Sequence, residues 1–370
     1  MEIKKIRFPL IIYFSSRLAI FSLASVFIGI LPTRTHPSFL QAFSQWDGRW
    51  YLEIIQNGYW YKGPLVQSPV AFFPLYPLLG KILTYFGLSP ALALFLIANL
   101  ACLGFFVVFW LLIKEEFSEK VANLALLYYA LSPLSFIFSS LYTESLFLLL
   151  CCSCFYFLKK KKILPAVLIA GLASATRPVG LVLILPILFA LWQQKRKLWL
   201  WIGPGLLSAS GLILFNLYLY LKVGKLAPYL EVVHRAWRRT WAMPWESFRF
   251  FWESILIIPR EHPFFPIAVF DLMMVLLFTI LMVYSLKKLK ISYQLFIWPV
   301  YFLSISQPWE PTFFLPSGSI SRYMFQLFPL VALLAQIGEK NRLIHYLIVF
   351  FFTSLFGVFS LAFFHGVWIE

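Results

Sequence analysis

The chain has only 15 acidic residues, so each one can be weighed as a source of chemistry. Asp47 lies in the segment QWDGRWYLEIIQNGYW, and Glu144 lies in SSLYTESLF. Two basic residues occur in similar polar breaks, Arg177 in SATRPVG and Arg322 in PSGSISRYMF. A carboxylate that takes a hydroxyl proton, with cations that stabilise a phosphate leaving group, is the set that sugar transfer from a lipid phosphate requires. We therefore take these four residues as the candidate site.

The two acids also have structural explanations. Asp47 lies three residues after Ser44, which is the spacing of a capping box at the start of a helix. Glu144 follows Thr143 and is expected to open a helix, where an acid favours the positive end of the helix dipole. Neither explanation excludes a role in catalysis.

The arginines have structural explanations as well. Arg177 is expected to end a short helix, where a cation suits the negative end of the dipole, and Arg322 would snorkel from a helix end. An arginine at membrane depth is nonetheless costly, so function is the first hypothesis for it.

Three further polar residues lie inside predicted membrane spans: Arg17, Asn99 and Asp271. Asp271 would lie roughly 10–12 Å below the outer end of its helix. An acid at that depth usually faces the bundle interior and pairs with another polar group. We expect a structural pair there rather than catalysis.

Arginine and tryptophan alternate in the segment EVVHRAWRRTWAMPWESFRFFW. Arg235, Arg238 and Arg239 have the spacing i, i+3 and i+4, which predicts an amphipathic helix lying on anionic lipid. The sharper alternative is that the same arginines bind the phosphate of a donor or acceptor.

No pattern in the sequence predicts a metal centre. The five histidines are scattered, and a single Asp motif lacks the paired acids of a metal clamp. No cofactor is expected, although a divalent cation stays an alternative. The four cysteines lie in apolar runs and are interpreted as small hydrophobic residues: Cys102, Cys151, Cys152 and Cys154.

The composition shows which elements must position these residues. Of 370 residues, 61% are hydrophobic and 12% are charged, and the mean hydropathy is +0.82. Globular chains carry about 25% charged residues. The chain is therefore expected to be an all-α polytopic membrane protein, which excludes a soluble enzyme, a nucleic-acid binder and a disordered protein. The net charge of +16 indicates loops that face an anionic leaflet.

Hydrophobic runs of sufficient length predict about eleven membrane crossings. The run 163–192 is broken at Thr176-Arg177-Pro178 and is expected to form two short helices, since proline suits the first position of a helix. The other predicted spans are 9–31, 90–113, 121–139, 143–158, 198–221, 264–286, 291–305, 324–338 and 343–364.

Basic clusters predict the orientation of these spans. If segment 70–88 lies in the interface rather than crossing, the clusters fall on the cytoplasmic side, with the N-terminus inside and the C-terminus outside. Loop 222–263 then lies outside despite seven basic residues. The clusters used for this assignment are 4–7, 114, 159–162, 195–197, 287–290 and 340–342.

Four motifs follow one another along the N-terminal half of the chain: WDGRWYLEIIQNGY, AFFPLYPLL, SPLSFIFSSLYTESLFLLL and SATRPVGLV. Together they resemble the PIG-V family of mannosyltransferases, which belong to the GT-C superfamily of membrane glycosyltransferases. The resemblance covers roughly residues 10–190, and beyond residue 190 it is limited to the segment SRYMFQLFPL. The first-loop motif supplies Trp46, Gly48, Arg49 and Tyr51 beside Asp47.

The resemblance implies a GT-C-type bundle with interfacial helices in the first outside loop. It implies one membrane domain over 1–370, with a catalytic half at 1–192 and a more variable half at 193–370. The implied reaction is an inverting transfer of mannose from a polyprenyl- or dolichol-phosphate donor to a lipid or glycolipid acceptor, similar to the GPI mannosyltransferases. It would take place on the non-cytoplasmic face of the plasma membrane in a prokaryote, or of the endoplasmic reticulum in a eukaryote.

The resemblance also implies roles for the candidate residues. Asp47 corresponds to the loop carboxylate expected to act as general base, and Glu144 falls in the family's Ser/Thr-Glu-Ser turn. Arg177 falls in the Arg-x-x-Gly segment and is expected to contact the donor phosphate. The other arginines expected at that phosphate are Arg322, Arg235, Arg238 and Arg239.

Two other classes of function stay open on the sequence. One is a related transferase of different specificity, such as protein O-mannosylation or transfer of another lipid-linked sugar. The other is a transporter of lipid or glycolipid, with polar residues along a pathway, although no inverted repeat is visible. A non-catalytic scaffold would leave the acids and arginines at one membrane face unexplained.

Overall fold

The computed structural model describes residues 6–30, 37–310 and 315–369. Within these ranges every regular element is a helix, and a single isolated β-bridge joins Arg239 to Trp309. The prediction of an all-α protein is therefore confirmed. The predicted end of the first span at residue 31 lies outside the described residues.

Five helices are long and apolar enough to cross a membrane, by length and composition. They are α1 (Arg7–Ile30), α5 (Pro90–Glu116), α10 (Ile202–Val223) with the short η5 (Leu198–Trp201) before it, α13 (Phe265–Ser285) and α17 (Arg342–Phe364). The protein is thus a multi-pass membrane protein. The number of eleven crossings stays a prediction, because the other spans form shorter helices.

The shorter helices follow the predicted spans closely in most places. They are α6 (Glu119–Leu131), α7 (Glu144–Lys159), α8 (Ile163–Thr176), α9 (Ile184–Gln193), α14 (Ile291–Ile305) and α16 (Phe328–Lys340). The predicted break within 163–192 is confirmed, since α8 ends at Thr176 and Pro178 begins the 3₁₀ helix η4 (Pro178–Leu183).

Two predicted spans are wrong in their bounds. Span 121–139 is helical only to Leu131, because Pro133 disfavours a helical conformation at Ser132, and the chain continues as the 3₁₀ helix η3 (Ser135–Phe138). Span 324–338 begins at Phe328, where Pro329 fits the first helical turn. The residues before it form the separate short helix α15 (Ile320–Met324).

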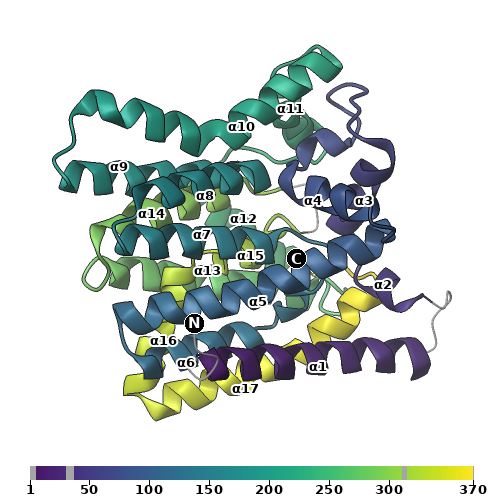
Figure 1. Cartoon of the computed structure of the whole chain (residues 1–370). Coiled ribbons are helices and arrows are strands. Elements are labelled where there is room, and N and C mark those ends of the chain that lie inside the picture. Colours follow the sequence, from purple (N-terminus) through teal and green to yellow (C-terminus); the bar gives the residue numbers. More distant parts are fainter. Residues whose placement is uncertain (1–5, 31–36, 311–314, 370) are drawn as a thin grey trace.

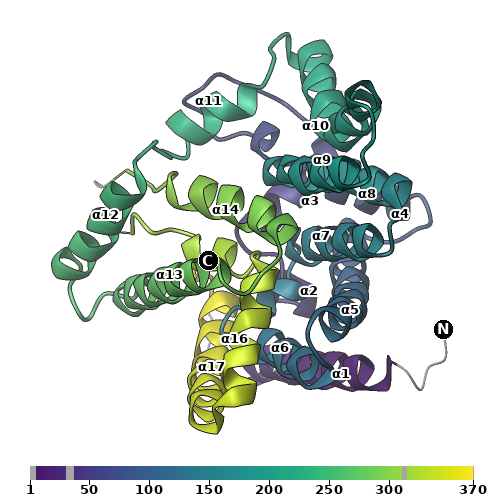
Figure 2. The same cartoon turned by 90° about the vertical axis from the view of Figure 1, so that its left-hand side faces the viewer.

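The helices pack as a row of layers. α10 packs on α8, α8 on α7, α7 on α5, α5 on α6, α6 on α16 and α16 on α17, as Figure 1 shows from one edge of the bundle to the other. Figure 2 views the bundle along these helices, with α10 and α17 at opposite edges. α1 packs against α5, α6 and α17. The chain therefore places the central helices α5 and α7 between outer helices on both sides.

The first long loop forms short helices at one end of the bundle. They are α2 (Phe39–Ala42), α3 (Asp47–Asn57), η2 (Pro69–Ala71) and α4 (Leu75–Thr84), with α4 packed on α3 and α5. Helix α4 has 10 residues, and at 1.5 Å per residue it reaches about 15 Å, half of the bilayer core. This length supports the prediction that segment 70–88 does not cross.

Segment 222–263 forms α11 (Pro228–Arg235) and α12 (Pro244–Ile257) instead of one continuous amphipathic helix. Arg238 has a φ of 53°, and Thr240 N donates to Pro308 O at 3.0 Å, so the chain between the helices pairs with a distant loop. The predicted helical spacing of Arg235, Arg238 and Arg239 is therefore wrong, since the helix ends at Arg235.

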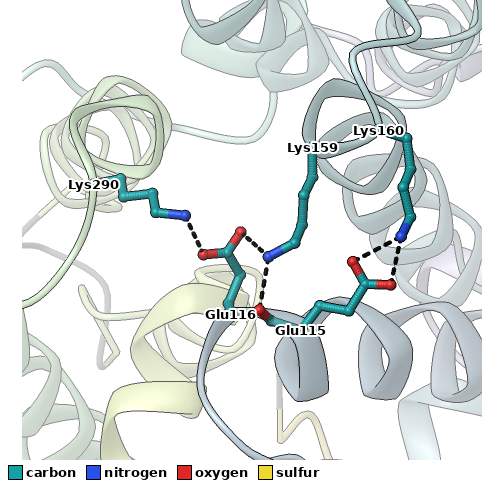
Figure 3. Close-up of polar contacts among 5 residues, drawn as sticks. All are labelled: Glu115, Glu116, Lys159, Lys160 and Lys290. Atoms are coloured by element: carbon teal, nitrogen blue, oxygen red, sulfur yellow. Dashed lines mark hydrogen bonds and ion pairs between the residues drawn. The ribbon is translucent and has the colours of Figure 1, made fainter.

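Figure 3 shows five charged residues that join α5, α7 and the start of α14. They lie at the far end of α7 from Glu144, because α7 begins at Glu144 and ends at Lys159. Glu116 accepts from Lys159 at 2.8 Å and from Lys290 at 2.7 Å, and Glu115 accepts from Lys160 at 2.7 Å. We call Glu115, Glu116, Lys159, Lys160 and Lys290 the lysine cluster. Because α7 has 16 residues, the cluster and Glu144 lie about 24 Å apart along the helix.

The polar residues predicted inside the first spans form one buried network. Arg17 Nη1 donates to Ser139 Oγ at 2.6 Å, and Ser139 Oγ donates to Asn99 Oδ1 at 2.8 Å. Arg17 Nη2 also donates to Ser135 Oγ at 3.0 Å. These bonds fix η3 against α1 and α5, just before the turn that carries Glu144.

Candidate functional site

The four candidate residues converge at one end of the bundle. Arg322 Nη1 donates to Asp47 Oδ2 at 2.9 Å, and Arg322 Nε lies 3.2 Å from Glu144 Oε1. Arg177 Nη1 donates to the same oxygen of Glu144. The residues come from the starts of α3 and α7, from the break after α8, and from α15. One guanidinium thus bridges two carboxylates that lie far apart in sequence.

A close approach of two loops brings the acids together. Leu141 N donates to Phe43 O at 3.0 Å, which ties the turn before α7 to the turn before α3. A Cβ atom on Gly48 would lie 3.2 Å from Leu141 Cβ, tighter than ordinary contact. The glycine of the WDG motif therefore lets Asp47 approach the turn that carries Glu144.

The capping-box explanation of Asp47 is wrong. A capping box would make Ser44 the N-cap residue, but helix α3 begins at Asp47 and its N-cap residue is Trp46. Ser44 Oγ donates to Leu40 O at 2.5 Å and closes the preceding turn instead. The Asp47 carboxylate turns to Arg322. The expectation that Glu144 opens a helix is confirmed, since it is the first residue of α7.

The two carboxylates differ in their access to solvent. The Asp47 side chain is 31% exposed, whereas the Glu144 side chain is 4% exposed. The cavity at Glu144 has a volume of about 10 Å³, and its lining combines apolar residues with Ser132, Glu144, Arg322 and Gln326. A space of that size suits a single water at most. Asp47 is therefore the more accessible of the two acids.

Tyr323 lies among three guanidinium groups. Its ring centroid is 5.4 Å from the guanidinium carbon of Arg322, 5.5 Å from that of Arg177 and 5.9 Å from that of Arg239. Burial alone would raise the pKa of Tyr323, but the three positive charges outweigh it, led by Arg239, and the pKa is lowered. The aromatic face thus holds three cations at one place.

Of the three arginines predicted to act together in segment 222–263, the structure brings only Arg239 to this place. Arg239 Nη1 donates to Gln307 O at 2.9 Å, and Nη2 donates to Gly318 O at 3.0 Å. Arg235 and Arg238 are exposed. We call Asp47, Glu144, Arg177, Arg239 and Arg322 the site cluster.

The other residues of the first-loop motif divide into two groups. Trp46 is 41% exposed. Arg49 is also exposed, and its side chain donates to Gln45 Oε1 at 2.8 Å rather than to a candidate acid. Tyr51 is buried and hydrogen-bonded to Thr143, and burial together with the nearby Asp47 raises the pKa of Tyr51. Gly48 and Tyr51 therefore support the site from within.

Sequence reasoning missed the two tyrosines that face Arg322. Tyr142 has its ring centroid 5.4 Å from the guanidinium carbon of Arg322, as Tyr323 does. Each tyrosine lies within two residues of a candidate charged residue in sequence. An aromatic residue beside a buried arginine is a signal for a cation–π contact, although it does not identify which arginine the ring meets.

Within the described ranges, no group of three or more His, Cys, Asp or Glu side chains lies close enough to hold a metal ion. The described cysteines are all buried and free. Both candidate carboxylates are bound by guanidinium groups. The arrangement can therefore offer a carboxylate to a hydroxyl and several guanidinium groups to an anion.

Comparison with known proteins gives one family match. A search of curated protein sequences found no match. The crystal structure of ArnT from Cupriavidus metallidurans bound to undecaprenyl phosphate is similar, with a TM-score of 0.48 and 11% sequence identity over 97% of this chain and 76% of that chain. Residues 15–199 match the mannosyltransferase (PIG-V) family, and this match includes Asp47, Glu144 and Arg177. The chain therefore belongs to the PIG-V mannosyltransferase family and is a membrane glycosyltransferase.

Proposed function

We propose that this protein transfers mannose from a polyprenyl- or dolichol-phosphate donor to a hydroxyl group of a lipid-linked or glycolipid acceptor, with inversion at the anomeric carbon. The observation that carries the proposal is the accessible carboxylate of Asp47 beside three guanidinium groups gathered on Tyr323. Membership of the mannosyltransferase family supports the choice of sugar.

Asp47 is the proposed general base. The acceptor hydroxyl attacks the anomeric carbon while the bond between that carbon and the phosphate oxygen breaks. The hydroxyl proton passes to the Asp47 carboxylate, and the bonding electrons leave with the phosphate. Asp47 suits this role because it is the more exposed of the two acids, at 31% against 4% for Glu144.

The arginines are the proposed phosphate site. The leaving phosphate is already an anion, so it needs cations more than it needs a proton donor. Arg177 and Arg322 pair with the two acids, whereas Arg239 is held in place by backbone carbonyls. Among the described ion pairs the charge of Arg239 is not matched by a carboxylate, and a phosphate would supply the missing negative charge.

Glu144 is proposed to position the arginines rather than to take the proton. It is almost fully buried, and its Oε1 atom meets both Arg177 and Arg322. A carboxylate held by two guanidinium groups is a poor proton acceptor because its charged form is favoured. Its bonds instead fix the spacing of the two cations that would face the phosphate.

The proposed reaction takes place on the non-cytoplasmic side. The lysine cluster lies at the opposite end of α7 from the site cluster. Loops rich in lysine favour the cytoplasmic side of a membrane. The same rule supports an outside position for the site, in the plasma membrane if the protein is prokaryotic.

The experiment measures transfer of radiolabelled mannose from polyprenyl-phosphate-mannose in membranes that contain the wild-type protein, Asp47→Asn or Glu53→Gln. Glu53 is the matched control, since it is an acid of the same helix that bonds to Asn57 and Trp60 rather than to the site cluster. We expect label to enter a new lipid with wild type and Glu53→Gln, and a loss of about 10²–10⁴-fold with Asp47→Asn. No transfer by the wild type would refute the proposed donor, and near-normal transfer by Asp47→Asn would refute the proposed base.

A further inference from the structure

We propose that Asp271 is a positioning residue for the donor site, and that it acts by clamping the segment that carries Arg322 and Tyr323. The inference rests on the proposed function, in which Arg177, Arg239 and Arg322 bind the donor phosphate. It goes beyond that function because Asp271 lies on α13, outside the site cluster, and nothing in the proposed chemistry uses it.

The clamp consists of one carboxylate and two serines. Ser317 Oγ donates to Asp271 Oδ2 at 2.7 Å, and Ser321 Oγ donates to Asp271 Oδ1. All three side chains are buried, and Asp271 is only 1% exposed. Each carboxylate oxygen thus has its own serine, one before and one within the short helix α15.

The clamped segment has a conformation that needs external support. Ser319 has a φ of 67°, in the left-handed region that non-glycine residues rarely adopt. Gly318 beside it packs so tightly that a Cβ atom would lie 2.4 Å from the Trp368 ring. Such a conformation persists only where the surrounding structure holds it in place. The bonds from Ser317 and Ser321 to Asp271 hold the chain on either side of Ser319.

The clamped segment positions two of the three arginines of the proposed phosphate site. Ser321, one end of the clamp, directly precedes Arg322, which binds both Asp47 and Glu144. Gly318, between the two clamped serines, accepts from Arg239 Nη2 at 3.0 Å. Loss of the clamp therefore shifts two of the three guanidinium groups together, without touching either candidate acid directly.

This geometry also bears on the alternative that Asp271 lines a transport pathway. A pathway residue must exchange partners with its cargo. Both oxygens of Asp271 are instead engaged by serines of the same segment, in a place that is closed to solvent. The contacts assign Asp271 to support of the site.

The test compares Asp271→Ala and Asp271→Asn with Thr279→Val. Thr279 is the matched control, because it lies in the same helix and makes a partly buried polar contact, to the Tyr301 hydroxyl at 2.5 Å, away from the site. Two properties are measured on the purified full-length protein. The first is hydrogen exchange of the backbone amides in segment 320–325, where the amides of Ile320, Tyr323 and Phe325 bond to backbone oxygens of residues 317, 319 and 321. The second is the KM for polyprenyl-phosphate-mannose and the KM for the acceptor.

We expect Asp271→Ala to speed exchange in 320–325 and to raise the donor KM about tenfold, with little change in the acceptor KM. Asp271→Asn keeps one acceptor oxygen and should recover part of both effects, whereas Thr279→Val should change neither. Adding Ser317→Ala and Ser321→Ala to Asp271→Ala should cost nothing further, since the three residues act as one unit.

The outcomes separate this inference from the proposed function. Unchanged exchange in Asp271→Ala would overturn the clamp. Faster exchange with an unchanged donor KM, or with an equal rise in both KM values, would overturn its role in the donor site. If the wild type does not use the donor at all, the proposed function fails, while the exchange data still decide whether the clamp exists.

Discussion

The site cluster and the lysine cluster contain the same numbers of charges but differ in cation type and burial. Each has two carboxylates and three basic residues, at opposite ends of α7. In the site cluster the side chains of Glu144, Arg322 and Arg177 are 4%, 7% and 14% exposed. In the lysine cluster Lys160 and Lys290 are 40% and 67% exposed.

The difference in cation type and burial indicates that the two clusters have different roles. A lysine is a hydrated point charge, and a partly exposed pair that it makes contributes about 1 kcal/mol at most. A guanidinium has several donors in a rigid fork, so Arg322 can hold two carboxylates at once and still face a third group. The lysine cluster joins helix ends, whereas the site cluster gathers the buried cations that the proposed phosphate site requires.

Apart from replacement of the proposed base Asp47, the largest effect is expected when the bridging arginine is removed. Arg322→Ala leaves Asp47 without its hydrogen-bonded cation and takes one of two guanidinium groups from Glu144. We expect transfer to fall by about 10²–10³-fold, the usual loss when one donor of a charge-stabilising site is removed. Arg49→Ala, an exposed arginine of the same region, should keep transfer within about twofold of wild type. Equal rates for the two variants in the radiolabel assay would contradict the bridge.

A smaller effect is expected from neutralising the shared acid. Glu144→Gln keeps the size of the side chain but removes the charge that holds Arg177 and Arg322 together, so we expect transfer to fall about tenfold to a hundredfold, with a lower melting temperature. Glu115→Gln removes an acid of the lysine cluster and should leave transfer unchanged. If Glu144→Gln kept full transfer, the proposed positioning role would be refuted.

The arginines of segment 222–263 allow a comparison within one stretch of chain. Arg239→Ala should raise the donor KM about tenfold, because Arg239 lies on Tyr323 and is not matched by a carboxylate among the described ion pairs. Arg235→Ala should leave the KM unchanged, since Arg235 is exposed at the end of α11. The measurement is donor saturation of both variants side by side. A larger shift for Arg235 would place the phosphate beside the end of α11 instead.

The smallest effect is expected in the lysine cluster itself. Lys290→Ala removes a cation that is 67% exposed, so the loss of stability should be less than about 1 kcal/mol. Transfer by this variant should match wild type. Chemical denaturation and the radiolabel assay check the two statements. A loss of transfer comparable to that of Glu144→Gln would mean that the two clusters are coupled through α7.

The sequence predicted those parts of the fold that depend on local pattern. Long apolar runs predicted the long helices, and Pro178 predicted the break that places Arg177 between α8 and η4. The motif residues Asp47, Glu144, Arg177 and Arg322 were predicted as one group, and the structure brings them together.

The rest depended on contacts between distant parts of the chain. The spacing of Arg235 and Arg239 predicted one helix, but the backbone of Arg239 pairs with Trp309, seventy positions away, and this contact overrides the local pattern. The capping box at Asp47 was wrong for a similar reason, because Arg322 comes from the far end of the chain. Asp271 was expected to pair with another polar group, but its partners Ser317 and Ser321 could not be named from the sequence, since packing sets them. The place of Tyr323 among the arginines depends on packing in the same way.

The most direct test of the central claim separates donor binding from turnover in Asp47→Asn. Purified wild type and Asp47→Asn are compared for equilibrium binding of polyprenyl-phosphate-mannose and for transfer in a single turnover. We predict equal donor binding, because the arginines hold the phosphate, and a loss of transfer of about 10²-fold or more, because the proton acceptor is gone. Near-normal transfer, or a loss of donor binding that accounts for the whole loss of transfer, would contradict the division of roles between the acid and the arginines.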